Sequence, residues 1–291
     1  MEQHIDAFIT YLLEVKHASK NTIQAYSNDL KKLQNFLQKL NITTITRISE
    51  TSLTSFVLSL EKEGLSPASV SRNIASVKAF LLYLLKQGKI TGDPSERMKA
   101  PKVIKKSPQI IDETLMDKLL KQPDKKTKKG IRDKAMLELM YATGMKVSEL
   151  TQMRMSDINL SGRYITCGEK KERNIPLGRT AKEAIQNYLE FRQNEFPSDV
   201  GDTLFLNSNG EPLSRQGFWK ILRGYAKEIG IDNMNPNIIR NSFAAHLIEN
   251  GADLSSVSEF LGHSDIAATQ AYLPQNHKST REVYMKTHPR A

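Results

Sequence analysis

Three residues in the last third of the chain, Arg240, His263 and Tyr272, are of types that can together handle a phosphate group. Arginine offers a planar fork for two phosphate oxygens. Histidine can donate to a third oxygen or move a proton, and a tyrosine hydroxyl can attack phosphorus once it is deprotonated or oriented. Because an isolated arginine, histidine or tyrosine is usually structural, their spacing alone does not establish a site.

Helix ends position all three side chains in the predicted secondary structure. Arg240 opens a helix predicted over residues 238–250, and His263 lies at a helix junction after residues 254–261. Gly251 suits a left-handed helix end, with Asp253 as the next N-cap. A short helical stretch, residues 266–271, leads to Tyr272. Side chains at such ends can converge on one anion.

The first hundred residues are predicted to form a four-helix bundle. Apolar residues recur at spacings of three and four in the first helix, around Ile5 and Leu12, and in the helices over residues 19–40, 53–60 and 67–87. Ser66 followed by Pro67 is typical of a helix start. Residues 101–107 then form a basic linker without sustained periodicity.

The remainder, residues 108–291, is predicted to be a mixed α+β domain, so the chain is mainly α with a small β-sheet. Strands are expected over 163–167, 173–177 and 203–206, the first two paired as a hairpin. The helices expected before the site lie over residues 112–121, 129–143, 180–196 and 214–229.

Composition and charge favour a cytoplasmic protein with a polyanionic partner. The longest apolar run of the 291 residues, 79–85, is far too short to span a bilayer, no secretory leader is recognised, and the one cysteine excludes an internal disulfide. The formal net charge is +10, and residues 1–107 hold 16 basic and 9 acidic side chains. Nucleic acid is the usual partner of such a surface, although many basic proteins have no such partner.

Several functional classes lack sequence support. The chain has no glycine-rich dinucleotide fingerprint, no P-loop and no Gly-x-Ser-x-Gly elbow, and its six histidines form no His-x-x-x-His pair. We therefore expect no nucleotide or metal cofactor.

Motifs along nearly the whole chain resemble those of the tyrosine recombinases, and most closely the bacterial Xer type. Residues 19–40 resemble the opening of that family's core-binding domain. Residues 141–150 (YATGMKVSEL) resemble its first catalytic box, and residues 243–254 follow its second box. Residues 261–265 (LGHSD) and 288–291 (HPRA) match as well.

The resemblance assigns family roles residue by residue and finds three matches and three departures. Arg240, His263 and the nucleophile Tyr272 match. The first-box arginine falls on Lys146, and the first histidine of the second box falls on Asn237. The lysine of the family's β-hairpin falls on Gly168, so Lys170 or Lys171 is the candidate leaving-group acid.

These departures have estimable consequences. Lys146 keeps the charge but loses the two-pronged contact of arginine, and Asn237 can donate a hydrogen bond but cannot carry a proton. Removing one preorganised donor to a developing oxyanion lowers the rate by about 10²–10³, and losing a general acid by about 10²–10⁴. Alternatively, Lys146 is a surface lysine at a helix end and Asn237 only caps its helix.

The resemblance implies a site-specific DNA recombinase that exchanges strands of double-stranded DNA through a 3′-phosphotyrosyl link. It implies a homo- or hetero-tetramer on DNA, with a possible second recombinase, roles in DNA integration or chromosome partition, and no membrane partner. Residues 276–288 resemble a terminal helix that docks on a neighbouring subunit. The candidate DNA contacts are Arg72, Lys99, Lys102, Lys105, Lys106 and Arg215.

Two alternatives remain open at this point. One is a degenerate recombinase homologue that binds DNA or a partner recombinase without cleaving. The other is a helical transcription regulator unrelated to recombination, which the motifs around Gly144 and Gly262 disfavour.

Overall fold

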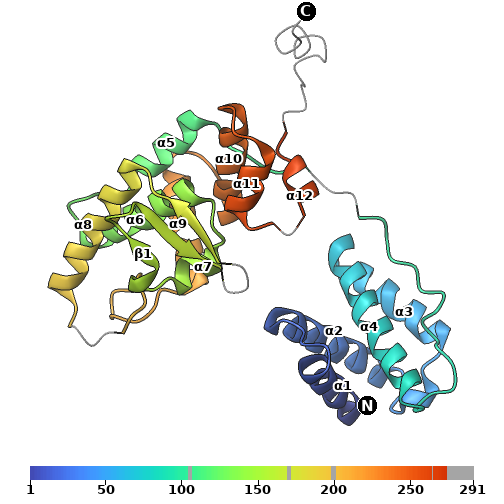
Figure 1. Cartoon of the computed structure of the whole chain (residues 1–291). Coiled ribbons are helices and arrows are strands. Elements are labelled where there is room, and N and C mark those ends of the chain that lie inside the picture. Colours follow the sequence, from blue (N-terminus) through green and yellow to red (C-terminus); the bar gives the residue numbers. More distant parts are fainter. Residues whose placement is uncertain (104–106, 169–171, 198–200, 264, 274–291) are drawn as a thin grey trace, which may run out of the picture. The chain divides into compact units, whose positions relative to one another are not determined.

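The chain forms two compact units, Met1–Lys106 and Ser107–Ala291, each of which is described by itself. The structure, a computed structural model, describes residues 1–103, 107–168, 172–197, 201–263 and 265–273. It is mainly helical with one small antiparallel sheet, which confirms the predicted fold class (Figure 1).

The first unit is the predicted bundle of four helices. Serines begin three of the helices: Ser19, Ser49 and Ser66 each accept a hydrogen bond from a main-chain N–H in the first turn. The apolar faces meet in one core that includes Phe8 and Phe80. The elements are α1 (Glu2–Glu14), α2 (Lys20–Lys39), the 3₁₀ turn η1 (Ile45–Arg47), α3 (Glu50–Lys62) and α4 (Pro67–Lys86).

One buried carboxylate links two helices of this bundle. Asp29 on α2 is fully buried and accepts hydrogen bonds from Ser76 Oγ at 2.8 Å and Arg72 Nη2 at 3.0 Å, both on α4. The Arg72 side chain remains about half exposed. A buried charge requires such partners, so Arg72 is held at the surface by a fixed anion beneath it.

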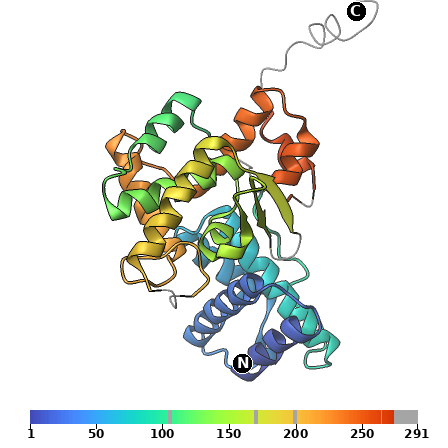
Figure 2. The same cartoon turned by 60° about the vertical axis from the view of Figure 1, so that its left-hand side comes forward.

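The second unit packs helices around a three-stranded sheet. The helices α6 and α8 lie side by side (Figure 1 and Figure 2) and share a core that includes Met136 and Tyr188. Its helical elements are α5 (Glu113–Lys121), α6 (Lys128–Thr143), α7 (Val147–Gln152), η2 (Met155–Asp157), α8 (Arg179–Glu195), α9 (Arg215–Glu228), α10 (Pro236–Glu249), α11 (Leu254–Leu261) and α12 (Ala267–Gln270).

The sheet confirms the expected hairpin but differs from the prediction in its third strand. β2 (Tyr164–Cys167) pairs with β3 (Arg173–Pro176) in antiparallel register, Ile165 opposite Ile175. The third strand is β1 (Ile158–Asn159), which precedes the hairpin. The strand predicted over residues 203–206 is wrong: Thr203 and Leu206 form only isolated bridges, to Arg154 and Pro212. Its apolar residues are buried by packing rather than by strand pairing.

Two glycines end the helices that flank the candidate site. Gly144 follows α6 with φ +59°, and Gly262 follows α11 with φ +65°. Both adopt the left-handed conformation that glycine takes without steric penalty. A β-carbon on Gly144 would lie 2.2 Å from Cδ1 of Phe243 on α10, so this helix end also needs a residue without a side chain.

We predict that Gly144→Ala destabilises the second unit through both effects. The left-handed backbone accounts for about 1–2 kcal/mol, and the clash with Phe243 adds about 1–3 kcal/mol. Urea unfolding of the full chain measures the loss. The control is Gly230→Ala, which has φ +77° with nothing within 4 Å of the new β-carbon. Equal losses in the two variants would show that the clash is relieved at no cost.

Candidate active site

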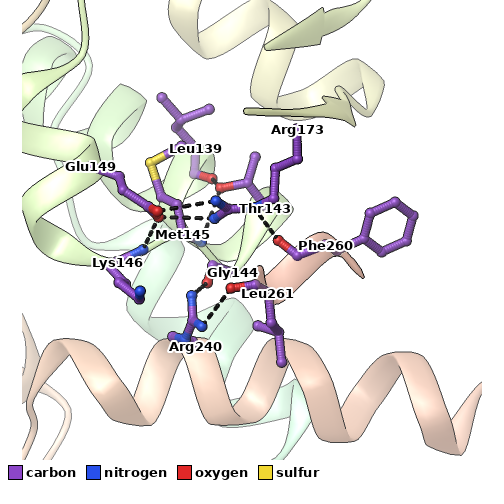
Figure 3. Close-up of polar contacts among 10 residues, drawn as sticks. All are labelled: Leu139, Thr143, Gly144, Met145, Lys146, Glu149, Arg173, Arg240, Phe260 and Leu261. Atoms are coloured by element: carbon purple, nitrogen blue, oxygen red, sulfur yellow. Dashed lines mark hydrogen bonds and ion pairs between the residues drawn. The ribbon is translucent and has the colours of Figure 1, made fainter. Parts of the chain in front are cut away.

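Arg240 is a buried cation at the centre of the site. It belongs to α10, and its two terminal nitrogens donate to the main-chain oxygens of Gly144 and Leu261, both at 2.7 Å (Figure 3). These oxygens stand at the carboxyl-terminal ends of α6 and α11, where helix carbonyls lack intrahelical partners and the helix dipole favours a cation. The guanidinium is therefore held in place by neutral groups.

The charge of Arg240 has no paired anion in the part of the chain that the structure describes. Its hydrogen bonds go only to carbonyl oxygens, and no ion pair to it is found there. Burial lowers the pKa of Arg240, but arginine stays protonated in proteins. Three of its five N–H donors remain for a ligand. Such a cation is suited to binding an anion.

A second arginine, Arg173 on β3, is neutralised by Glu149 on α7. Its two terminal nitrogens donate to the two carboxylate oxygens at 3.0 and 2.9 Å, and its Nε donates to the main-chain oxygen of Phe260 at 2.7 Å (Figure 3). Burial alone raises the pKa of Glu149, but hydrogen bonds from Arg173 and from the Lys146 N–H outweigh it and hold the pKa below its ordinary value.

Sequence reasoning missed this pair. Glu149 stood in the first-box motif and Arg173 in an expected strand, but neither was assigned a role. The available signal was the opposite charge of the two side chains. Together, Arg173 and Arg240 bind the last two carbonyls of α11 and so fix the start of the loop that carries His263.

His263 follows Gly262 directly and is half-buried. Its Nδ1 lies 2.8 Å from the Thr269 hydroxyl on α12. Burial lowers the pKa of His263, and the charges of Arg240, Lys146 and Arg173 lower it further. The imidazole is therefore neutral at pH 7, with one nitrogen able to accept a proton.

Tyr272 follows α12 and packs beside the small core formed by α10 and α11 around Phe243. Its hydroxyl donates to Oδ1 of Asn241 at 3.0 Å. Burial raises the pKa of Tyr272, and the charge of Arg240 opposes that rise. The charge of Arg240 thus influences the pKa of both His263 and Tyr272, which links the guanidinium, the imidazole and the phenol electrostatically.

Lys146 is the exposed N-cap of α7, directly after the end of α6. Its main-chain N–H donates to Glu149 Oε2 at 2.8 Å. The interpretation of Lys146 as a lysine at a helix end is correct for its position. The charge of its ammonium group nevertheless lowers the pKa of His263, as the charge of Arg240 does.

Asn237 does not cap its helix, so that alternative interpretation is wrong. The N-cap of α10 is Asn235, whose Oδ1 accepts from the main-chain N–H of Asn237 at 3.0 Å. Asn237 is exposed and lines a hollow of about 680 Å³ whose wall includes Arg215, Trp219 and Val147. Its side chain is thus free of the capping role and faces a basic, aromatic-lined hollow.

Gly168 stands at the end of β2 with φ +110°. A lysine at this position would be strained, because side chains rarely adopt this backbone conformation. The alternative candidates, Lys170 and Lys171, lie outside the described residues.

The candidate DNA contacts are scattered over the first unit and α9. Arg72, Lys99 and Lys102 are half-exposed or exposed, and Arg215 lines the hollow beside Asn237. Lys105, Lys106 and the predicted terminal helix over residues 276–288 lie outside the described residues.

The described residues contain neither a metal-binding cluster nor a membrane-spanning helix. No group of three or more histidine, cysteine, aspartate or glutamate side chains there is arranged to hold a metal ion. In the same part of the chain, no helix combines the length and apolarity that crossing a membrane requires.

Comparison with known families matches both units. Residues 109–279 match the Phage integrase family, and residues 5–88 match the Phage integrase N-terminal SAM-like domain. Tyrosine recombinase XerD of Listeria innocua is 42% identical over the full length of both chains. Tyrosine recombinase XerC of Herpetosiphon aurantiacus is 39% identical over 94% of this chain and 90% of its own.

Solved structures share the fold at lower identity. The Tn1549 transposon integrase in complex with circular intermediate DNA has a TM-score of 0.78 at 16% identity, covering 97% of this chain and 99% of its own. The XerH site-specific recombinase, in a post-cleavage complex with its palindromic difH substrate, has a TM-score of 0.73 at 22% identity, covering 93% and 80%.

We predict that Glu149→Gln destabilises the protein by about 1–3 kcal/mol at pH 7, because it removes the charge that Arg173 binds in a buried setting. Since the folded-state pKa of Glu149 is lowered, its contribution is complete above the unfolded pKa and disappears as the pH falls through the folded pKa. The difference between variant and parent should therefore shrink below about pH 4.3.

Urea unfolding at a series of pH values measures this difference. Asp117→Asn is the control, because Asp117 forms an exposed i,i+4 pair with Lys121 and is expected to contribute less than about 0.5 kcal/mol. A Glu149→Gln deficit that is constant with pH would mean that the ionised carboxylate is not the stabilising form.

Proposed function

Because this chain belongs to the phage integrase family of tyrosine recombinases, we propose that it binds duplex DNA at a specific site and exchanges strands there. The observation that carries the proposal is the buried guanidinium of Arg240, which lacks a paired anion among the described residues and whose charge acts on the pKa of both Tyr272 and His263. A phosphodiester supplies the missing negative charge. The names of the relatives, all recombinases, favour this activity over binding without cleavage.

The roles of the side chains follow from their chemistry. Arg240 and Lys146 bind the non-bridging phosphate oxygens, which become more negative in the transition state. Asn237 donates a hydrogen bond to the same phosphate. His263, whose pKa is lowered by burial and by the charges of three cations, donates to the phosphate or accepts the proton of the Tyr272 hydroxyl. Arg173 and Glu149 only hold this constellation in place.

Cleavage is a transfer of phosphorus between two oxygens. The Tyr272 hydroxyl loses its proton to a base, for which the neutral His263 imidazole is the proposed acceptor, its oxygen forms the new bond to phosphorus, and the bond to the 5′-oxygen breaks. The leaving oxygen takes a proton, for which Lys170 or Lys171 is the proposed donor. A 5′-hydroxyl of the partner strand then attacks the phosphorus of the phosphotyrosyl link, which joins the exchanged strand and releases the Tyr272 hydroxyl. The phosphotyrosyl link conserves the bond energy, so the exchange needs no nucleotide cofactor.

Basic side chains and a neighbouring subunit are proposed to hold the protein on DNA. Arg72, Lys99, Lys102, Lys105, Lys106 and Arg215 are proposed to contact the phosphate backbone, and such contacts make affinity strongly salt-dependent. The two predicted domains, residues 1–100 and 108–291, are joined by the linker 101–107 and hold the duplex. The segment 276–288 docks on a neighbouring subunit. Strand exchange takes place in a tetramer, with a second copy or a partner recombinase. Action on bacterial chromosomal DNA corresponds to a cytoplasmic location.

We predict that the protein forms a covalent adduct with nicked duplexes that carry candidate recombination sites. Tyr272→Phe abolishes the adduct, because phenylalanine has no attacking oxygen. A denaturing gel reveals the adduct, and a mobility shift measures binding separately. Tyr164→Phe is the matched control and retains the adduct, because it removes a hydroxyl whose hydrogen-bond partner among the described residues is Asn159. A clear mobility shift without any adduct in the parent protein contradicts the cleavage proposal.

We predict that the double change Lys146→Arg with Asn237→His accelerates adduct formation by about 10–10²-fold, because it restores a two-pronged phosphate contact and a titratable donor. Both positions are exposed and have ordinary backbone angles, whereas Gly168→Lys would be strained at φ +110° and is left out. Lys121→Arg, the same conservative change at an exposed lysine, is the control. A slower double variant refutes the assignment of these positions to the phosphate.

A further inference from the structure

The hydroxyl of Tyr272 has a hydrogen-bond partner to which the family motifs assign no role. Asn241, the residue after Arg240 on α10, accepts the Tyr272 hydrogen bond through Oδ1 at 3.0 Å. Its Nδ2 donates to the main-chain oxygen of Gln109 at 3.1 Å. One amide therefore connects the tyrosine with the start of the second unit.

These two contacts fix the orientation of the Asn241 amide. Oδ1 can only accept and Nδ2 can only donate, so the hydroxyl proton and the Gln109 carbonyl are both satisfied in one orientation only. A flipped amide would direct its NH₂ at the hydroxyl and its oxygen at a carbonyl. The acceptor for Tyr272 is thus held in a defined direction.

The segment that carries the Gln109 carbonyl is held in place by contacts of Ile111, two residues further on. The main-chain N–H of Ile111 donates to Ser242 Oγ at 3.0 Å, and His246 Nε2 lies 3.0 Å from the Ile111 oxygen. A ring nitrogen facing a carbonyl must donate, so His246 Nδ1 accepts from the Tyr141 hydroxyl at 2.8 Å. The segment 109–111 is therefore fastened along α10, the helix that carries Arg240 and Asn241.

We propose that Asn241 is a positioning residue for Tyr272. The hydrogen bond to the Gln109 carbonyl holds the Asn241 amide in place, and the amide oxygen in turn orients the phenol hydroxyl of Tyr272. The proposal rests on the function proposed above. A single hydroxyl has one proton, and committing it to Asn241 fixes where the oxygen lone pairs point. A neutral amide does not take the proton, so the tyrosine stays a phenol until a base removes it. Orientation of this kind strongly affects the rates of displacement reactions.

The test uses the full-length protein with Asn241→Ala, Asn241→Asp and the control Gln109→Ala. The control leaves the contact intact, because Gln109 contributes its main-chain oxygen. Mobility shifts measure affinity for a nicked duplex, and single-turnover adduct formation at saturating DNA measures attack as a function of pH. In the free protein, carbon NMR of tyrosine-labelled samples, assigned with Tyr272→Phe, gives the pKa of Tyr272 without any need for cleavage.

The two Asn241 variants are expected to change the pKa of Tyr272 in opposite directions. Asn241→Ala removes an acceptor that favours the neutral phenol and lowers the pKa, whereas Asn241→Asp places a negative charge beside the hydroxyl and raises it. Asn241→Ala slows adduct formation by about tenfold at unchanged DNA affinity. Asn241→Asp moves the pH profile of attack to higher pH by about one unit. Gln109→Ala matches the parent in every measurement.

Failure of this inference can be told apart from failure of the proposed function. If the parent protein binds DNA but forms no adduct, the cleavage proposal is wrong, and the NMR titration still decides whether Asn241 holds the hydroxyl. The positioning role is overturned if neither Asn241 variant changes the pKa of Tyr272. Where the parent does cleave, an Asn241→Ala variant that attacks as fast as the parent also overturns it.

Discussion

The active-site region is organised by one buried positive charge that is held without a counterion among the described residues. Arg240 binds the carbonyl ends of α6 and α11, where the partial negative charge of each helix terminus stabilises the guanidinium. A carboxylate in the same place would have neutralised it. Because the supporting groups are neutral dipoles, the cation is fixed in position and its charge remains available to an anionic ligand.

The family departures and the retained residues lie in different surroundings. Lys146 and Asn237 are exposed, and Gly168 ends a strand beside the hairpin turn. Arg240 and the Arg173–Glu149 pair, in contrast, are largely buried and join α7, α10, α11 and the sheet. Exposed positions can change without disturbing packing, since they leave no cavity and no unpaired buried charge. The fold therefore tolerates the departures at these positions.

The contacts of α10 relate the site to the beginning of the second unit. Three successive residues of this helix make these contacts: Arg240 binds the helix ends, Asn241 accepts from the tyrosine hydroxyl and donates to the Gln109 carbonyl, and Ser242 accepts from the Ile111 N–H. The segment that follows the linker is therefore part of the support of Tyr272.

The sequence by itself determined the helices and the N-caps Ser66 and Asp253, because apolar periodicity and capping depend on near neighbours. It singled out Arg240, His263 and Tyr272 by residue type and by the family resemblance. It also identified the family and the departures from it. Only the tertiary structure decided that residues 203–206 are not a strand and that Asn235 rather than Asn237 caps α10. The Glu149–Arg173 pair and the Asn241–Tyr272 bond join positions 24 and 31 residues apart, and packing alone brings such positions together.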